Sequence, residues 1–400
     1  MDGSFFGLAL GFASLSTVLP LFVSNLTHSA VLIGLIPAIH TVGWYLPQVF
    51  TAQRVSQLRR YKPMVMFWTI HERVPFLGMA IVAWFVPQIG PSIALFLTFS
   101  LLIWQGIGGG LAANPWQNMI GKIIPRERWG IFFGSQSAAS TLLGAVGVFI
   151  AGLVLQNNMP NAGFSKCFLL AVGAFTVSYI AIALTREVET APAAVTVERK
   201  DFWKELRSIL NRDANFRWFV AVRILAQLGT AGFAFYTVYV VRFYGVNAVT
   251  VGILGTILYI SQTIFNPIMG WLGDNWSHRG VMALGMVAAA ISAGITIWAP
   301  SMGWFYLAYA LAGIAYVGVW TIALAMTQEF GKPHEKPSYI GLANTLIAPT
   351  AFIIPVFAGL LADSVGYKAT FLVTAIGALV TALVLGFILK DHTKPVIIEE

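Results

Sequence analysis

The sequence predicts an all-α integral membrane protein, with twelve transmembrane helices arranged as two six-helix bundles. Its composition, its long apolar segments and an internal repeat lead to this prediction. Hydrophobic residues make up 58% of the 400 residues, and charged residues only 10%. Soluble domains carry about 25% charged residues, so most of this chain must face lipid. The net charge of +8 is then an orientation signal at the membrane surface rather than a sign of nucleic-acid binding.

The apolar segments have the length of membrane-spanning helices. Such a helix needs about 20 mostly apolar residues. The sequence contains twelve segments of this kind, 4–24, 30–50, 64–87, 91–116, 130–156, 164–185, 215–242, 248–272, 280–299, 302–327, 338–362 and 367–389. We expect each of them to cross the bilayer once.

The basic residues of the connecting segments alternate between a rich and a poor side. Nineteen of the 24 Lys and Arg residues fall in segments that share one side with the chain termini. The other side holds only Lys166, Arg242 and Lys368. Because basic residues collect on the cytoplasmic side, this pattern predicts that both termini are cytoplasmic, in a plasma or inner membrane.

The longest hydrophilic stretch lies in the middle of the chain. It divides the sequence into an N-terminal bundle (1–185), a cytoplasmic linker (186–213) and a C-terminal bundle (214–400). Within the linker, apolar residues recur at helical spacing, which predicts an amphipathic helix on the membrane surface. These residues are Phe202, Trp203, Leu206, Ile209 and Leu210.

Short motifs occur in the same order in the two halves. Ser29-Ala-Val-Leu-Ile-Gly34 corresponds to Asn247-Ala-Val-Thr-Val-Gly252, and Ala151-Gly-Leu corresponds to Ala358-Gly-Leu. The order and the similar offset of these pairs indicate that six helices have been duplicated.

A ten-residue motif lies between the eighth and ninth segments. It reads Gly270-Trp-Leu-Gly-Asp274-Asn275-Trp-Ser277-His278-Arg279. The motif and the six-plus-six organisation resemble the major facilitator superfamily over essentially the whole chain. Gly270, Asp274 and Arg279 match the loop signature of that family, whereas Asn275, Ser277 and His278 depart from it. The resemblance implies alternating access and a latch between the halves at this cytoplasmic loop.

Four ionisable residues lie inside predicted spans. His71, Glu72 and Arg73 are consecutive, and ten residues of helix place Glu72 roughly 15 Å beyond Lys62, near the middle of the bilayer. Charges at that depth are paired or functional, so a structural ion pair and a role in proton coupling or solute binding both stay open. Arg223 is roughly 9 Å beyond Arg217, and we expect it to extend its side chain to the interface.

The spans that surround the pathway in this family carry polar and aromatic side chains. The candidates for lining a cavity are His40, Gln48, Gln105, Gln136, Gln227, Tyr236, Tyr259, Gln262, Asn266, Tyr309, Tyr316, Trp320 and Asn344. As a set they offer amides, hydroxyls and aromatic faces with almost no formal charge. This favours a neutral or lipophilic solute over a dicarboxylate or phosphate ester, which would require paired arginines.

No catalytic, metal-binding or cofactor-binding pattern occurs in the sequence, and Cys167 is its only cysteine. We therefore predict a monomeric secondary transporter of a small organic molecule, without cofactor, metal or nucleic acid. Efflux of a neutral or lipophilic compound is favoured, and coupling to protons stays open. The alternatives are uptake of a polar metabolite such as a sugar, or a membrane receptor or scaffold that transports nothing.

Overall fold

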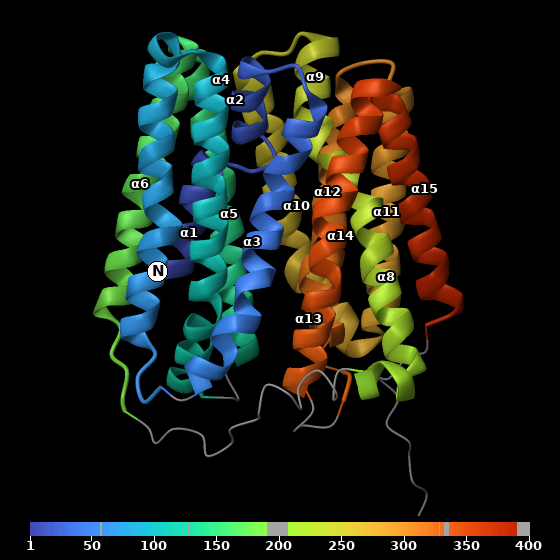
Figure 1. Ribbon diagram of the computed structural model, residues 1–400. Coiled ribbons are helices and arrows are strands. Elements are labelled where there is room, and N and C mark those ends of the chain that lie inside the picture. The colour runs from blue at the N-terminus through green and yellow to red at the C-terminus, as the bar shows by residue number, and fades with distance from the viewer. Residues whose placement is uncertain (57, 126–128, 190–206, 328, 332–335, 390–400) are drawn as a thin grey trace, which may run out of the picture.

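The computed structural model describes residues 1–56, 58–125, 129–189, 207–327, 329–331 and 336–389. This part of the chain consists of helices and short connections, without a strand (Figure 1). The prediction of an all-α, multi-pass membrane protein is confirmed. Of the predicted linker helix, Phe202, Trp203 and Leu206 lie outside the described residues.

The N-terminal helices begin with a span that is broken in the middle. A short α1 ends before a non-helical connection, and α2 completes the pass. The elements are α1 (Asp2–Phe12), α2 (Val18–Leu26), α3 (Ala30–Ser56), α4 (Lys62–Ile123), α5 (Trp129–Gln156) and α6 (Pro160–Leu184).

The C-terminal helices contain two further interrupted spans. A 3₁₀ segment η2 joins α8 to α9, and a π-helical segment η3 joins α12 to α13. The elements are α8 (Ala214–Thr230), η2 (Ala231–Phe235), α9 (Tyr236–Tyr244), α10 (Ala248–Asn275), α11 (His278–Trp298), α12 (Gly303–Val317), η3 (Gly318–Ile322), α13 (Ala323–Thr327), α14 (Lys336–Ser364) and α15 (Tyr367–Phe387).

The long α4 makes two passes, because the chain reverses at Gly90. This glycine has φ 79° and ψ 160°, a conformation open to a residue without Cβ. The indole Nε1 of Trp104 donates a hydrogen bond to Nδ1 of His71 (3.1 Å), which lies on the opposite arm. Ten segments of the described chain are long and apolar enough to span a membrane. With α4 counted twice and the broken first span added, each of the twelve predicted segments has a helical counterpart.

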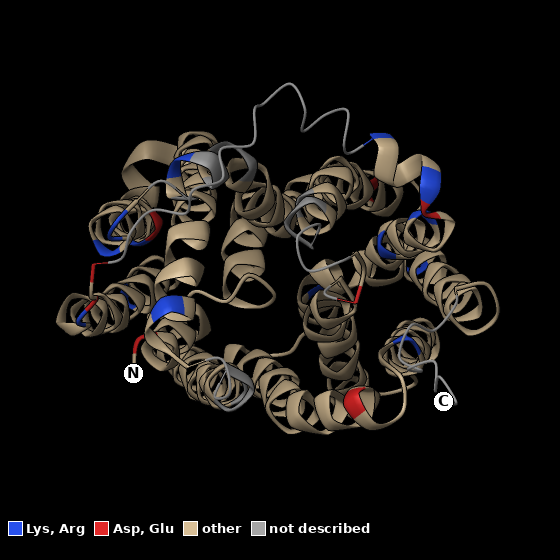
Figure 2. Cartoon of the chain, turned by 90° about the horizontal axis from the view of Figure 1, so that it is seen from below, with Lys and Arg blue, Asp and Glu red and all other residues tan. Residues whose placement is uncertain are grey.

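The helices that precede residue 190 lie mainly on the left of Figure 1, and those that follow residue 206 mainly on the right. The view from below shows the same two groups, with few charged positions among the helices (Figure 2). Helix α10 packs against α5, and α14 packs against α3. A Cβ on Gly152 would collide with the backbone of Gly252, so small residues allow α5 and α10 to approach closely.

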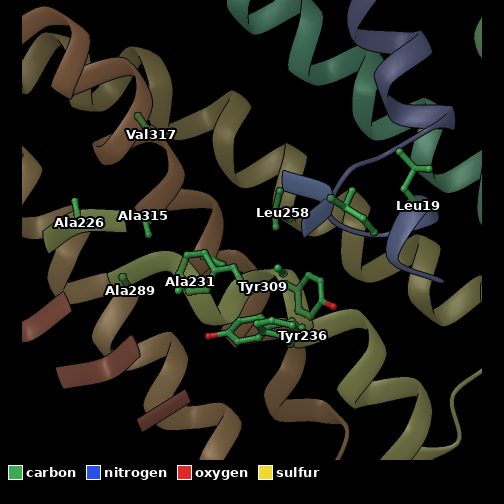
Figure 3. Packing of buried hydrophobic residues seen from close by; sticks show 14 of the residues in the cluster. Leu19, Ala226, Ala231, Tyr236, Leu258, Ala289, Tyr309, Ala315 and Val317 are labelled. Atoms are coloured by element: carbon green, nitrogen blue, oxygen red, sulfur yellow. The ribbon is translucent and has the colours of Figure 1, made fainter. Parts of the chain in front are cut away.

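Aromatic residues fill the interior of the C-terminal helices. The buried Tyr236 and Tyr309 pack near Leu258 (Figure 3), with 5.8 Å between the centroids of the two tyrosine rings. Leu19 of α2 belongs to the same buried cluster. The core therefore continues from the N-terminal to the C-terminal helices.

Candidate functional site

A cavity of about 330 Å³ lies between the two groups of helices. It is lined by α1, α3 and α5 from the N-terminal side and by α8, α10, α12 and α14 from the C-terminal side. Seven of the candidates predicted from the sequence line this cavity. They are His40, Gln227, Tyr259, Gln262, Asn266, Tyr316 and Trp320.

All three interrupted spans meet at the cavity. Ser16 lies in the break between α1 and α2, Ala231 and Ala234 belong to η2, and Val319 and Trp320 belong to η3. Discontinuous helices are tolerated at membrane depth where their backbone is buried in protein or lines a cavity. The breaks therefore single out this cavity as the candidate functional site.

Several small hydroxyl residues of the lining were not among the predicted candidates. They are Ser16, Thr41, Ser137, Thr141, Thr230 and Thr321. Two of them form hydrogen bonds with residues of α10. The Thr321 hydroxyl donates to Oδ1 of Asn266 (2.7 Å), and Thr141 accepts from the hydroxyl of Thr263 (2.7 Å). Serine and threonine are common inside membrane helices, where they bond their own backbone, so the sequence alone gave no reason to select them.

The lining combines polar and apolar side chains and carries no Asp, Glu, Lys or Arg among its described residues. The Nδ1 atom of His40 lies 3.1 Å from Oε1 of Gln105, so Gln105 supports the histidine from behind. Amide and hydroxyl groups offer both donors and acceptors, while Tyr259, Tyr316 and Trp320 add aromatic surface. No group of three metal-ligating side chains occurs in the described part of the chain.

The other predicted candidates lie outside the cavity. The amide of Gln48 donates to the carbonyl of Trp44 in its own helix (2.8 Å). Gln136 packs against the first turn of α1, at Gly3. Neither residue is part of the cavity lining.

Tyr236 and Tyr309 are interior residues of the C-terminal helices. The Tyr236 hydroxyl lies 3.0 Å from Oγ of Ser292, and the Tyr309 hydroxyl lies 3.0 Å from Oγ1 of Thr237. Buried tyrosines need such partners, and these hydrogen bonds hold both hydroxyls inside the bundle.

Arg223 does not extend to the surface as expected from the sequence. Its residue is only 5% exposed, and its guanidinium approaches the hydroxyl of Tyr45 and Oδ1 of Asn344, each at 3.5 Å. Tyr45 belongs to α3, and its ring stacks on Trp320 with 5.9 Å between centroids. These residues therefore connect the two groups of helices beside the cavity.

Glu72 and Arg73 belong to a separate cluster within the N-terminal helices. Arg73 lies 3.5 Å from a Glu72 oxygen and 3.6 Å from an Asp2 oxygen, and it donates to Oγ of Ser178 (3.0 Å). Both residues are buried, and neither lines the cavity. His71 points elsewhere, toward Trp104.

The loop motif forms its contacts within the C-terminal helices. A Cβ on Gly270 would meet open space. Asp274 lies 3.3 Å from Nε2 of His278, and Nδ1 of His278 lies 2.6 Å from Oε1 of Glu329. Arg279 donates to the carbonyl of Leu389, just beyond α15, where a basic residue complements the helix dipole.

Comparisons with known proteins agree with this architecture. The sequence model of the Major Facilitator Superfamily matches residues 220–399, and no curated protein sequence matches significantly. The fold is similar to that of the nucleoside transporter NupG, at 12% identity over 96% of this chain and 97% of that one, with a TM-score of 0.76.

Two further solved transporters share the fold. A D-xylose-proton symporter has 13% identity over 98% of this chain and 97% of its own, with a TM-score of 0.72. A POT family transporter in complex with a thioalcohol-conjugated peptide has 14% identity over 96% and 94%, with a TM-score of 0.69. The sequence of the C-terminal helices therefore matches the Major Facilitator Superfamily, and the chain shares the fold of these solved transporters over nearly its whole length.

Proposed function

We propose that this protein is a secondary transporter that carries a small organic solute through the central cavity by alternating access. Residues 1–185 and 214–400 would be the two moving bodies, joined by the linker 186–213. The observation that carries the proposal is the meeting of three interrupted spans, from both groups of helices, at one cavity of about 330 Å³ whose lining includes amides and hydroxyls.

The cavity suits a solute whose main body is neutral. Its described lining combines aromatic faces with amides and hydroxyls and carries no formal charge. A lipophilic compound with few polar groups would use Tyr316 and Trp320, and its export is the direction favoured by the sequence analysis. A polar metabolite is the second candidate, because Gln227, Gln262 and Asn266 present three amides to the cavity, and two proteins of similar fold are named for xylose and nucleoside transport.

The proposal also includes the orientation of the chain in the membrane and the coupling of transport to protons. The distribution of basic residues supports cytoplasmic termini. His40 is the imidazole of the cavity lining, and imidazole changes charge near neutral pH, which supports a coupling role for protons. The transporter would act as a monomer, since both groups of helices needed for the cavity come from one chain.

Flux measurements in proteoliposomes test the transport proposal. Vesicles loaded with a mixture of sugars, nucleosides, neutral aromatic compounds and aromatic carboxylates would be assayed by mass spectrometry for protein-dependent release. We expect release of at least one class, and we expect Gln227→Ala to reduce it at least tenfold. The matched control is Gln48→Ala, which removes an amide that lies outside the cavity. Absence of any protein-dependent flux would favour the receptor or scaffold alternative.

A further inference from the structure

We propose that Arg223 binds an anionic group of the transported solute, so that the solute is an aromatic monocarboxylate whose neutral body occupies the central cavity. This inference rests on the proposed transport function and specifies its substrate class.

Arg73 and Arg223 are buried to a similar extent but have different partners. Arg73 is 7% exposed and has two carboxylates within ion-pair distance, those of Asp2 and Glu72. Arg223 is 5% exposed, and no carboxylate of the described residues lies within ion-pair distance of it. Its five N–H donors have two neutral oxygen acceptors at 3.5 Å and the Phe219 ring at 6.0 Å.

An unpaired guanidinium is costly in the interior of a membrane protein. Buried charges are normally paired, and a cation without a counterion destabilises the fold by several kcal/mol. Arginine cannot lose its proton to avoid this cost. A site that keeps such a charge is suited to a ligand that supplies the missing anion.

The position of Arg223 places this anion at the edge of the cavity. Arg223 borders a small space of about 10 Å³ together with Tyr45, Gln227 and Trp320. Gln227, Val319 and Trp320 also line the central cavity. A solute in the cavity would contact Gln227, Val319 and Trp320, and these side chains are what separates it from the guanidinium.

Tyr45 occupies the place that the anion would take. A space of about 10 Å³ holds at most one water molecule, so a carboxylate enters only when the Tyr45 phenol moves away. Tyr45 belongs to α3 and Arg223 to α8, so the two partners come from different groups of helices. A relative movement of the two groups of helices would therefore exchange the phenol for the carboxylate of the solute.

The chemistry of the site favours a monocarboxylate. One guanidinium recognises one carboxylate in a bidentate manner, whereas a dicarboxylate or phosphate ester would leave further charge facing the uncharged lining. Trp320, Tyr316 and Tyr259 provide aromatic surface for a planar body. An aromatic ring that carries a single carboxylate combines both requirements.

Binding of benzoate and of its neutral isostere benzamide tests the inference. Calorimetric titration of the purified protein should show benzoate binding at least tenfold more tightly than benzamide. We expect Arg223→Gln to abolish this preference. The control Arg217→Gln, which changes the exposed arginine of the same helix, should retain it.

A second variant keeps the test decisive if Arg223→Gln folds poorly. Tyr45→Phe removes the competing hydroxyl but keeps the aromatic ring, and it should increase the affinity for benzoate without changing that for benzamide. The inference is overturned if wild-type protein does not bind benzoate or does not prefer it to benzamide, if Arg223→Gln retains the preference, or if Tyr45→Phe leaves it unchanged. Protein-dependent flux of neutral solutes without a benzoate preference would reject the anion site and keep the transport proposal. Arg223-dependent benzoate binding without any flux would keep the anion site and reject the transport proposal.

Discussion

Asp363, at the end of α14, accepts a hydrogen bond from the backbone N–H of Ala30, the first residue of α3, at 2.7 Å. The same carboxylate also accepts from the backbone N–H of Val31 (3.2 Å) and the hydroxyl of Ser29 (3.1 Å). The first N–H groups of a helix have no partner within the helix, and here a residue more than 330 positions away in sequence supplies it. Asp363 therefore joins the end of α14 in the C-terminal helices to the start of α3 in the N-terminal helices.

The first prediction concerns this end of the molecule. Asp363→Ala removes an N-cap interaction, and such caps are worth about 1 kcal/mol, up to about 2 kcal/mol. If alternating access separates α3 from α14 here, the open state should gain about 5- to 30-fold in population relative to the closed one. Labelling of a cysteine placed in the α2–α3 connection by a membrane-impermeant reagent would measure the change.

The neighbouring Ser364 provides a control at the same helix end. Its hydroxyl donates to the carbonyl of Leu360 in its own helix (2.7 Å), so Ser364→Ala should leave the labelling rate unchanged. Equal labelling of wild-type and Asp363→Ala protein would show that this contact does not control opening.

The second prediction concerns the cluster around Arg73. Arg73→Met leaves the carboxylates of Asp2 and Glu72 without their cation, and breaking a buried pair in this way costs about 3–5 kcal/mol. Glu72→Gln should cost less, because Arg73 keeps Asp2 and Ser178 as partners. Apparent melting temperatures in detergent should therefore fall strongly for Arg73→Met and weakly for Glu72→Gln.

Two further measurements separate a structural from a coupling role of Glu72. Arg73→Met combined with Asp2→Asn and Glu72→Gln removes all three charges and should recover part of the lost stability. A stable Glu72→Gln protein that exchanges solute but cannot accumulate it in a pH gradient would instead assign proton coupling to this residue.

The third prediction concerns the loop between α10 and α11. Asp274 is 77% exposed, so Asp274→Asn should change stability by less than about 0.5 kcal/mol. His278 connects Asp274 to Glu329, which follows α13 and thus the interrupted span of the cavity. We expect Asp274→Asn to slow transport several-fold while solute affinity changes little.

Asn275→Ala is the matched control, because its amide donates only within its own helix, to the carbonyl of Trp271 (2.8 Å). Flux and equilibrium binding would be measured in parallel for both variants. Unchanged flux in a well-folded Asp274→Asn protein would remove the loop motif from the transport cycle.

The membrane spans could be predicted from the sequence because a lipid environment demands long apolar helices. The two passes within α4 can also be distinguished in the sequence, because Pro87 and Pro91 flank Gly90, where the chain reverses. The breaks within the interrupted spans could not be predicted, because they depend on hydrogen bonds to residues that are distant in the sequence. The N–H of Gly232 in η2 donates to Oγ1 of Thr374 in α15 (2.9 Å), and the Thr237 hydroxyl donates to the carbonyl of Ser16 in the first break (2.7 Å).

The cavity residues were predictable only in part, for a geometric reason. Residue type and depth place a polar group in the membrane interior, but the rotation of each helix decides where the group points. Gln227 and Gln262 face the cavity, whereas Gln48 bonds its own helix. Burial of Arg223 depends on the packing of Tyr45 from α3, which no local pattern of α8 reveals.

The last prediction concerns the pH dependence of the connection between α4 and α6. The carboxylate of Glu187, whose side chain is 1% exposed, accepts from the backbone N–H groups of Tyr61 (2.9 Å) and Lys62 (2.8 Å) and from Nζ of Lys122 (3.0 Å). Burial acts to raise the pKa of Glu187, but these hydrogen bonds and the Lys122 charge outweigh it and hold the pKa below its usual range.

A carboxylate with a lowered pKa stabilises the fold above the pKa of the unfolded chain, about 4.3 for glutamate, and loses this contribution as the pH falls through the lower folded value. Glu187→Gln should therefore cost about 1.5–3 kcal/mol at pH 7, the range for a hydrogen bond to a charged group, and the cost should shrink progressively below about pH 4. Apparent melting temperatures across this pH range measure it. Glu189, 56% exposed and paired with the equally exposed Arg60, is the control, because a surface pair of this kind contributes about 0–1 kcal/mol. A Glu187→Gln deficit that does not shrink between about pH 4 and about pH 2 would mean that the side chain acts through its shape rather than its charge.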